Sequence, residues 1–313
     1  MAIDLKGKFL GAVVGSALGD AIGEIAFHTP TREGLLRAIE HANELRYTDD
    51  TAMALGLAES IIRRKSVDPQ DLGDTFRRNY EREPWRGYAS GPPTIFSMVR
   101  STGLSYVEAA RHLFAGSGSL GNGAAMRIAP VGLFFHNSDR LYEEAAASAE
   151  VTHAHPVGKD GAAVLARAIA QAVKLDSAEK FPLESLGRGL VDFSRTDEIR
   201  KKTELVRELL REDISPDRAT RRLGRSVAVH ESMPFAVYSF LRHPKSFEEC
   251  LFCSVLNGGD RDTLGAMACA ISGAYLGTDA IPHRWREKLE NRAIIEEMAV
   301  SLLEARTAPT LDP

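Results

Sequence analysis

Residues 257–277 read NGGDRDTLGAMACAISGAYLG, and this stretch indicates the fold class more clearly than any other. Its apolar residues recur at helical spacing along a stripe made of Leu264, Met267, Ala268, Ile271 and Tyr275. The other faces of the same helix are also small or apolar. Because a helix that is apolar all round is normally buried, we expect this one to lie at the centre of the protein.

Helical spacing also dominates the rest of the chain. The N-terminal run MAIDLKGKFLGAVVGSALGDAIG is interpreted as the first helix of the folded domain, and further helices are expected over 51–65, 158–174, 199–211, 215–228, 246–256 and 285–305. Strand signals are scarce, and the Pro- and Gly-rich segments 87–94 and 117–130 are interpreted as loops. The sequence therefore predicts one all-α, many-helix domain over residues 1–306, followed by a loose tail at 307–313.

Composition narrows the possible functions. A formal net charge of -4 over 313 residues provides no basic face for nucleic acid. No segment approaches the roughly eighteen uninterrupted apolar residues of a membrane helix, and no signal-peptide cleavage pattern follows the N-terminal run. Three cysteines cannot form a disulfide framework, and the apolar context of Cys250 and Cys253 favours core packing over a redox or zinc site. We expect a cytoplasmic monomer.

Two acidic clusters share one design, TDDT at 48–51 and DRDT at 260–263, each directly before an expected helix. Asp and Thr are good helix N-caps, so capping explains one acid per helix. A second carboxylate beside the first would be repelled in a poorly solvated place. A divalent cation removes that repulsion, and oxygen-only ligands favour Mg²⁺ or Mn²⁺ over Zn²⁺. The residues alone leave capping and metal binding both open.

Five motifs carry a resemblance to a known family. They are GSALGDAIG near the N-terminus, YTDDTAMAL, GNGAAMRIAP, THAHP and NGGDRDTLGAMA, in that order. From about Gly11 to about Gly277 the chain resembles the ADP-ribosylglycohydrolases, a family that includes the dinitrogenase reductase-activating glycohydrolases. TDDT alone is a weak signal, whereas five motifs in order are a strong one.

The resemblance implies an all-α fold with two Mg²⁺ ions, for which Mn²⁺ is the possible substitute. The implied ligands are Thr48, Asp49 and Asp50 for one ion, Asp260 and Thr263 for the second, and Asp262 for both. On the substrate side, the GNG loop is expected to support the ADP-ribose pyrophosphate through backbone N–H groups, with a histidine beside the phosphates. These implied substrate-binding residues are Ser119, Gly121, Asn122, Gly123 and His153.

The chain departs from the family pattern at two positions. Arg261 stands between the aspartates of the second cluster, where a threonine is usual, and Phe27 stands where many members carry a glutamate. The nearest acid is Glu24, which a flexible loop after Gly23 would bring inward. Glu24 and Asp50 are therefore the two candidates for the catalytic general base.

The expected function is magnesium-dependent hydrolysis of a glycosidic bond that links ADP-ribose to a protein side chain. The expected partner is ADP-ribose or an ADP-ribosylated protein. Two alternatives stay open: hydrolysis of a small ADP-ribose derivative such as an O-acyl ester, and a non-catalytic ADP-ribose-binding or structural role. The second alternative arises because the family resembles certain lens crystallins.

Overall fold

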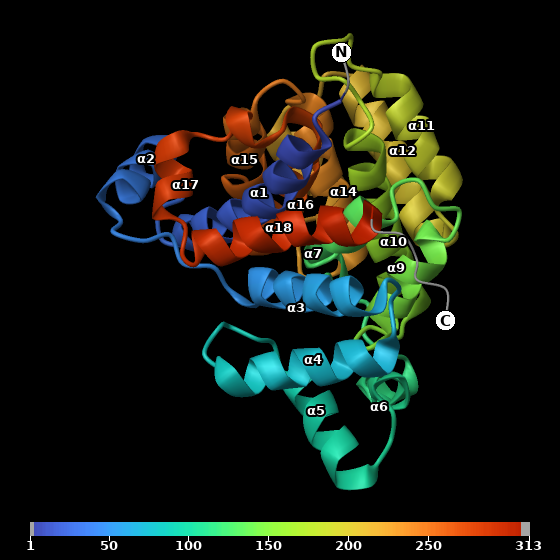
Figure 1. The fold of residues 1–313 in the computed structure, drawn as a ribbon. Coiled ribbons are helices and arrows are strands. Elements are labelled where there is room, and N and C mark those ends of the chain that lie inside the picture. The colour runs from blue at the N-terminus through green and yellow to red at the C-terminus, as the bar shows by residue number, and fades with distance from the viewer. Residues whose placement is uncertain (1–2, 308–313) are drawn as a thin grey trace.

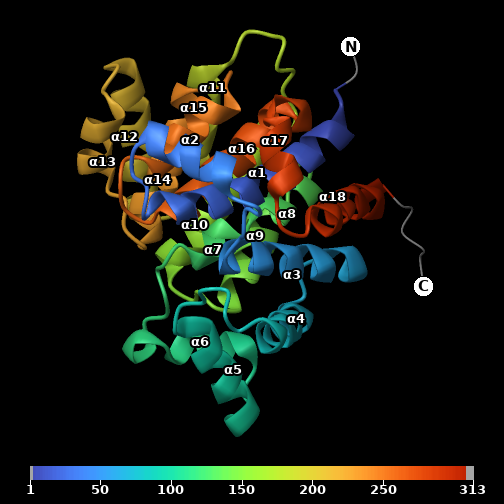
Figure 2. The same ribbon diagram turned by 90° about the vertical axis from the view of Figure 1, so that its left-hand side faces the viewer.

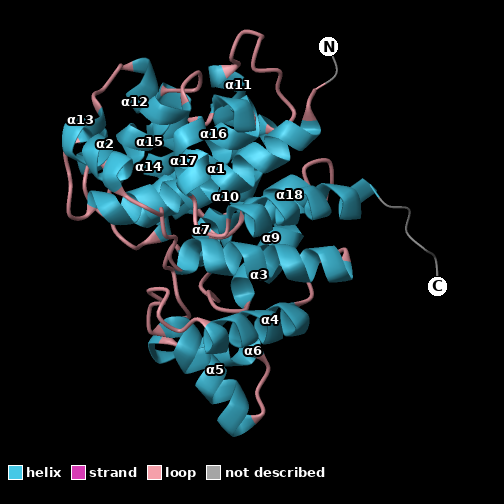
Figure 3. Ribbon diagram, turned by 60° about the vertical axis from the view of Figure 1, so that its left-hand side comes forward, coloured by secondary structure: helices cyan, strands magenta, loops and turns pink. Residues whose placement is uncertain are grey.

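The computed structural model describes residues 3–307, which fold into eighteen α-helices and two short 3-10 helices without a β-strand (Figure 3). The predicted all-α fold is therefore confirmed. The helices are α1 (Leu5–Ala26), α2 (Arg32–His41), α3 (Asp49–Arg64), α4 (Pro69–Arg82), α5 (Gly91–Thr102), α6 (Tyr106–His112), α7 (Gly123–Met126), α8 (Ala129–Phe134), α9 (Leu141–Glu150), α10 (Pro156–Ala172), α11 (Leu183–Phe193), α12 (Asp197–Arg211), α13 (Pro216–Leu223), α14 (Val229–Arg242), α15 (Phe247–Val255), α16 (Arg261–Leu276), α17 (His283–Lys288) and α18 (Arg292–Thr307). Residues 308–313 of the expected tail lie outside the described part of the chain.

Helices α1 and α16 pack against each other over their whole lengths and form the centre of the upper layer (Figure 1). Leu264, Met267, Ile271 and Tyr275 of α16 are fully buried, as the sequence predicts. Helices α10, α14, α15 and α18 surround this pair. The chain thus places its first long helix beside one that follows more than two hundred residues later.

The close approach of α1 and α16 depends on glycines that face each other. A Cβ added to Gly19 or Gly265 would lie well inside 3.0 Å of the other residue's carbonyl oxygen, a distance that real Cβ atoms essentially never show. The same holds for Gly11 and Gly273, which face each other closer to the N-terminus of α1 and the C-terminus of α16. The two backbones are therefore in direct contact, and this contact fixes how the N-terminus of α16 sits beside α1.

Helix α1 is also long and apolar enough to cross a membrane, with a mean hydropathy of 1.4 in its most apolar window. In the folded protein 83% of that window is buried. The prediction that this segment is the first helix of the folded domain is confirmed.

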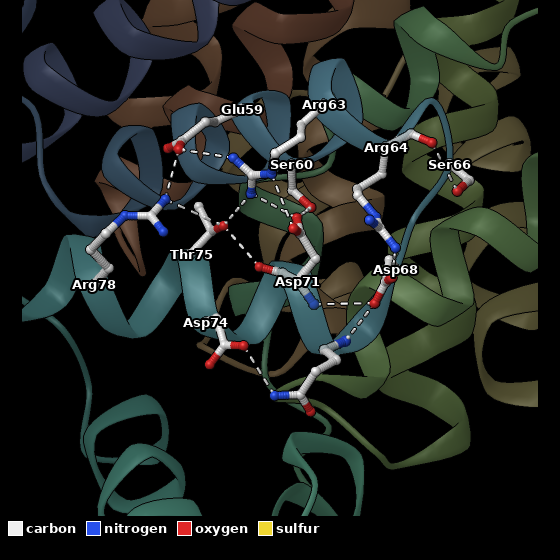
Figure 4. Close-up of polar contacts among 11 residues, drawn as sticks. Glu59, Ser60, Arg63, Arg64, Ser66, Asp68, Asp71, Asp74, Thr75 and Arg78 are labelled. Carbon is white, nitrogen blue, oxygen red and sulfur yellow. Dashed lines mark hydrogen bonds and ion pairs between the residues drawn. The ribbon is translucent and has the colours of Figure 1, made fainter. Parts of the chain in front are cut away.

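Helices α4, α5 and α6 form a smaller layer beneath α3 (Figures 1 and 2). Polar contacts join α3 to α4, as Figure 4 shows. Arg63 donates to Asp71 at 2.7 and 3.0 Å, and Ser60 donates to the same carboxylate at 2.7 Å. Glu59 accepts from Arg63 and from Arg78. These contacts hold in place the helix whose N-terminus carries the first acidic cluster.

Two expected helices differ in extent from the observed ones. Segment 215–228 contains α13 only as far as Leu223, because Gly224 adopts a φ of +89° and ends it. Segment 285–305 is divided between α17 and α18, where Asn291 has a φ of +52°. In both places a left-handed backbone conformation interrupts an amphipathic pattern that continues on either side.

Two expected loops were partly wrong for a shared reason. Helix α5 begins inside 87–94, at Gly91, and 117–130 contains α7 and the start of α8. Both α5 and α8 carry proline in the first turn. Proline is tolerated there because that N–H has no helical partner in any case, so these prolines begin helices.

Candidate active site

One cavity of about 500 Å³ lies where several distant parts of the chain meet. Its walls include the N-termini of α3 and α16, the Gly-rich loop 117–123, the loop 87–92, and short segments at 152–153 and 227–228. The aspartates that line it are Asp49, Asp50, Asp260 and Asp262. The fold therefore brings the two acidic clusters to one wall of a single cavity, although more than two hundred residues separate them.

Thr48 caps helix α3, since its Oγ1 accepts from the N–H of Asp50 at 3.4 Å. The same hydroxyl donates to Asp20 Oδ1 at 2.8 Å. Thr48 is absent from the residues that line the cavity, whereas Asp49 and Asp50 are present. The structure thus gives Thr48 a capping and positioning role and leaves its expected role as a metal ligand untested.

Asp20 is a site residue that the sequence motifs did not single out. It is fully buried in α1, and its carboxylate accepts four groups: the N–H and the hydroxyl of Thr48, and those of Thr51. These bonds tie α1 to the start of α3. Burial raises the pKa of Asp20 to about 6 in spite of them. The available signal was a carboxylate in the apolar part of α1, within the motif GSALGDAIG.

Three of the four cavity aspartates, Asp49, Asp50 and Asp262, have pKa values raised above the ordinary value. Burial, then the charge of Asp20, raises the pKa of Asp49 to about 7. Burial, then the charge of Asp260, raises that of Asp262 to about 8. The pKa of Asp50 is also raised well above its ordinary value, first by burial and then by Asp20 and Asp262. Several carboxylates thus disfavour one another's charge in a poorly solvated place.

A divalent cation fits this wall by its donor chemistry. All the polar side chains of the two clusters that face the cavity are oxygen donors, and Oδ2 of Asp50 is buried without a hydrogen-bond partner. Within residues 3–307, however, no three Asp, Glu, His or Cys side chains are gathered closely enough to hold an ion by themselves. Metal binding would therefore use threonine, water or substrate oxygens as well, or draw the carboxylates together.

The second cluster is shaped by the turn that precedes it. Gly258 and Gly259 have φ values of +82° and +79°, which favour glycine, and the N–H of Asp260 then donates to the carbonyl of Arg225 at 3.0 Å. Asn122 donates from Nδ2 to Asp260 Oδ2 at 2.7 Å. The asparagine of the Gly-rich loop therefore orients a carboxylate of the acidic wall.

The side chains of residues 261–263 point in different directions. Asp262 and Thr263 line the cavity, and the N–H of Thr263 donates to Asp262 Oδ1 at 2.8 Å. Arg261 instead donates to the carbonyl of Val255 at the end of α15 and is absent from the cavity lining. The guanidinium that replaces the family's usual threonine thus points away from the acidic wall.

The expected substrate residues Ser119, Gly121, Asn122, Gly123 and His153 all line the same cavity. The structure changes how the loop can act, because the N–H of Gly121 donates to Ser119 Oγ at 3.1 Å and that of Asn122 to the carbonyl of Val227 at 2.8 Å. Two of the backbone donors expected to support a pyrophosphate are therefore already engaged within the protein.

Glu24 lies in the last turn of α1, so the expected flexible loop after Gly23 is wrong. Its side chain is exposed and does not line the cavity. It is nevertheless close enough to Asp262 for its charge to raise the pKa of that carboxyl. Phe27, at the position where the family often has a glutamate, is the C-terminal cap residue of α1 and is 43% exposed.

The outer rim of the cavity is apolar. Phe114, Leu120 and Val227 line it and are 66%, 36% and 64% exposed. Large apolar side chains at the rim of a polar cavity suit a ligand with a flat hydrophobic end. The cavity thus combines an acidic inner wall, a Gly-rich loop beside a histidine, and an apolar rim.

Comparisons with known proteins show which family the chain is similar to. The family model described as ADP-ribosylglycohydrolase matches residues 1–311. ADP-ribosylhydrolase ARH3 of Mus musculus is 32% identical over 94% of this chain and 90% of its own length, and the Homo sapiens protein of that name is 31% identical over 94% and 92%. A solved structure titled ADP-ribosylglycohydrolase-related protein complex aligns with a TM-score of 0.74 at 26% identity, covering 97% of this chain and 99% of the other.

The family match and the similarity to the ARH3 proteins support a hydrolase of the kind that acts on ADP-ribosyl bonds. The chain belongs to the ADP-ribosylglycohydrolase family.

Proposed function

We propose that this protein hydrolyses the glycosidic bond that links ADP-ribose to a protein side chain, with two Mg²⁺ ions as cofactors. The observation that carries the proposal is the meeting of Asp49, Asp50, Asp260 and Asp262 on one wall of a cavity that is also lined by the Gly-rich loop and His153. A cavity of about 500 Å³ lies within the usual range for ligands of this size.

The oxygen donors that would hold the ions are those that line the cavity, namely the four aspartates and Thr263. When bound, the ions would supply positive charge that orients the ribose hydroxyls and makes a water molecule more acidic. Asn122 fixes the orientation of Asp260, and Asp20 fixes the start of α3 through Thr48 and Thr51. These contacts limit how far the carboxylates can move.

The reaction proposed is attack of water on the anomeric carbon of the ribose as the glycosidic bond breaks, through an oxocarbenium-like state. Asp50 and Glu24 are the two candidates for the general base that accepts a proton from that water. Asp50 lines the cavity and has a buried carboxylate oxygen without a hydrogen-bond partner. The side chain of Glu24 makes no hydrogen bond or ion pair within residues 3–307, so its exposed carboxylate is free to turn toward Asp262.

The test is release of ADP-ribose from substrates in which it is linked to arginine, to serine, to nucleic acid or through an O-acyl ester, with Mg²⁺ and with a chelator. Mg²⁺-dependent release from a side-chain glycosidic linkage supports the proposal, and release from the ester alone supports the smaller-substrate alternative. Asp262→Ala is the matched inactive control. Binding of ADP-ribose without release from any substrate would overturn the enzymatic proposal and favour a non-catalytic role.

A further inference from the structure

Arg127, on the segment that follows the Gly-rich loop, is a fully buried cation, and no ion pair with it is found within residues 3–307. Its guanidinium donates to the carbonyl of Gly123 at 3.0 Å, to that of Ser148 at 3.0 Å and to Thr152 Oγ1 at 2.7 Å. Its carbon lies 4.7 Å from the ring centroid of Phe76. Because a guanidinium can only donate, the hydroxyl of Thr152 must accept from it.

The hydroxyl of Thr152 has a second neighbour, Nδ1 of His153, at 2.7 Å. Thr152 is 1% exposed, so its own proton needs an acceptor within the protein, and among the described residues His153 Nδ1 is the remaining one. A proton on Nδ1 would leave the hydroxyl proton buried without a partner, which disfavours that form by about tenfold or more. Nδ1 therefore accepts, and the ring proton sits on Nε2.

Nε2 of His153 lies over the Gly-rich loop. A Cβ added to Gly123 would be 3.0 Å from this nitrogen and 2.8 Å from Cε1, and one added to Gly121 would be 3.5 Å from it. The ring thus rests on a backbone that lacks side chains, at the wall of the cavity. Burial, and then the charge of Arg127, lowers the pKa of His153 to about 3, so the ring is neutral at physiological pH.

We propose that Thr152, oriented by Arg127, is a positioning residue that fixes His153 as the neutral Nε2–H tautomer, so that this N–H donates to the phosphate beside which the family resemblance places the histidine. The inference rests on the proposed function for its ligand. The N–H groups of Gly121 and Asn122 are engaged within the protein, so the histidine supplies a donor that they cannot. A neutral donor matches a phosphate oxygen, which can only accept.

The tautomer is measured in the ligand-free protein labelled with ¹⁵N-histidine, from the two-bond proton–nitrogen correlations of the imidazole. His153→Asn identifies the signal among the nine histidines. We expect the wild-type protein and Thr152→Ser to show the Nε2–H pattern, because both keep the hydroxyl. Thr152→Val keeps the shape and removes the hydroxyl, so we expect its ring to show a mixture of tautomers. An Nδ1–H or doubly protonated ring in the wild-type protein would overturn the proposal.

The second measurement is the affinity for ADP-ribose, determined by calorimetry. We expect Thr152→Val to weaken binding by about tenfold and Thr152→Ser to remain within about threefold of the wild-type protein. Equal affinity in Thr152→Val and the wild-type protein would refute the proposed contact, and so would a loss in Thr152→Ser equal to that in Thr152→Val. Should Thr152→Val fail to fold, the wild-type tautomer and the serine variant still decide the matter. A wild-type protein that shows the Nε2–H tautomer but binds no ADP-ribose refutes the proposed function and leaves the tautomer assignment standing.

Discussion

Replacing Gly19 by alanine adds one methyl group to the contact between α1 and α16. The new Cβ would lie well inside 3.0 Å of the carbonyl oxygen of Gly265, so the two helices would have to separate locally by roughly an ångström to restore ordinary contact. Overpacking a core costs about 1–3 kcal/mol, and this site belongs at the upper end because backbone atoms obstruct the methyl group and cannot rotate away. We expect a loss of about 3 kcal/mol and a fall in Tm of roughly 5 °C.

The Gly19→Ala variant should also bind Mg²⁺ less tightly, for a geometric reason. Asp20 follows Gly19 directly, and Asp262 lies one turn before Gly265, so separating the helices also separates the groups at the acidic wall. We expect Mg²⁺ affinity, measured by calorimetry on the folded fraction, to fall together with Tm.

The matched control is Gly91→Ala, at the first residue of α5. Its added Cβ would be 3.8 Å from Leu113 Cδ1, an ordinary contact. Because Gly91 directly precedes Pro92, alanine brings no gain in helix stability here, but no backbone atom of another helix obstructs it. This variant should therefore lose much less Tm than Gly19→Ala. Equal melting temperatures for Gly19→Ala and Gly91→Ala would refute the argument that the α1–α16 contact requires glycine.

Three further predictions concern the acidic wall. Asp262→Ala should abolish activity and tight Mg²⁺ binding, whereas Arg261→Thr, whose side chain points toward α15, should change kcat/KM by less than about tenfold; equal losses in the two would contradict this. Glu24→Gln should lower kcat by roughly 10²-fold and leave ADP-ribose affinity within a few-fold, while unchanged turnover would leave Asp50 as the base. The pKa values of Asp49 and Asp262 are raised to about 7 and about 8. The folded protein without metal therefore retains protons that the unfolded chain releases near pH 4. Because the folded state then binds more protons than the unfolded state, its Tm should fall as pH rises from about 5 to 8. Mg²⁺ should raise Tm more at pH 8 than at pH 5 in a thermal melt, and a metal-free Tm that rises over this range would contradict the prediction.

The helical class and the central position of α16 could be predicted from the sequence, because an apolar pattern with helical spacing has one common outcome in a large soluble domain. The expected substrate and metal positions could be named from ordered motifs, and most of them line one cavity. Helix ends were less predictable, since the break at Asn291 depends on a single backbone angle within a pattern that otherwise continues.

The supporting contacts of the site were beyond reach from the sequence for a different reason. Asp20 and Arg127 act through tertiary hydrogen bonds to residues about thirty or twenty-five positions away, and no local spacing encodes such partners. The arrangement at the Gly-rich loop was also hidden, because engagement of the Asn122 N–H depends on Val227 from a distant segment. A motif names the residues that meet a ligand, whereas the groups that orient them appear only in three dimensions.

The packing of α1 against α16 has a consequence for biosynthesis. A ribosome adds about 5–20 residues per second, so roughly 10–50 s pass between completion of α1 at Ala26 and the first residue of α16 at Arg261. Throughout this interval the nascent chain carries an apolar helix of membrane-spanning length, with its glycine face open and no partner to cover it. Holdase chaperones bind such segments, so this helix is where the growing chain most needs one. A nascent chain that stops before Asp260 also lacks half of the acidic wall, so the site can assemble only after the start of α16 has been made.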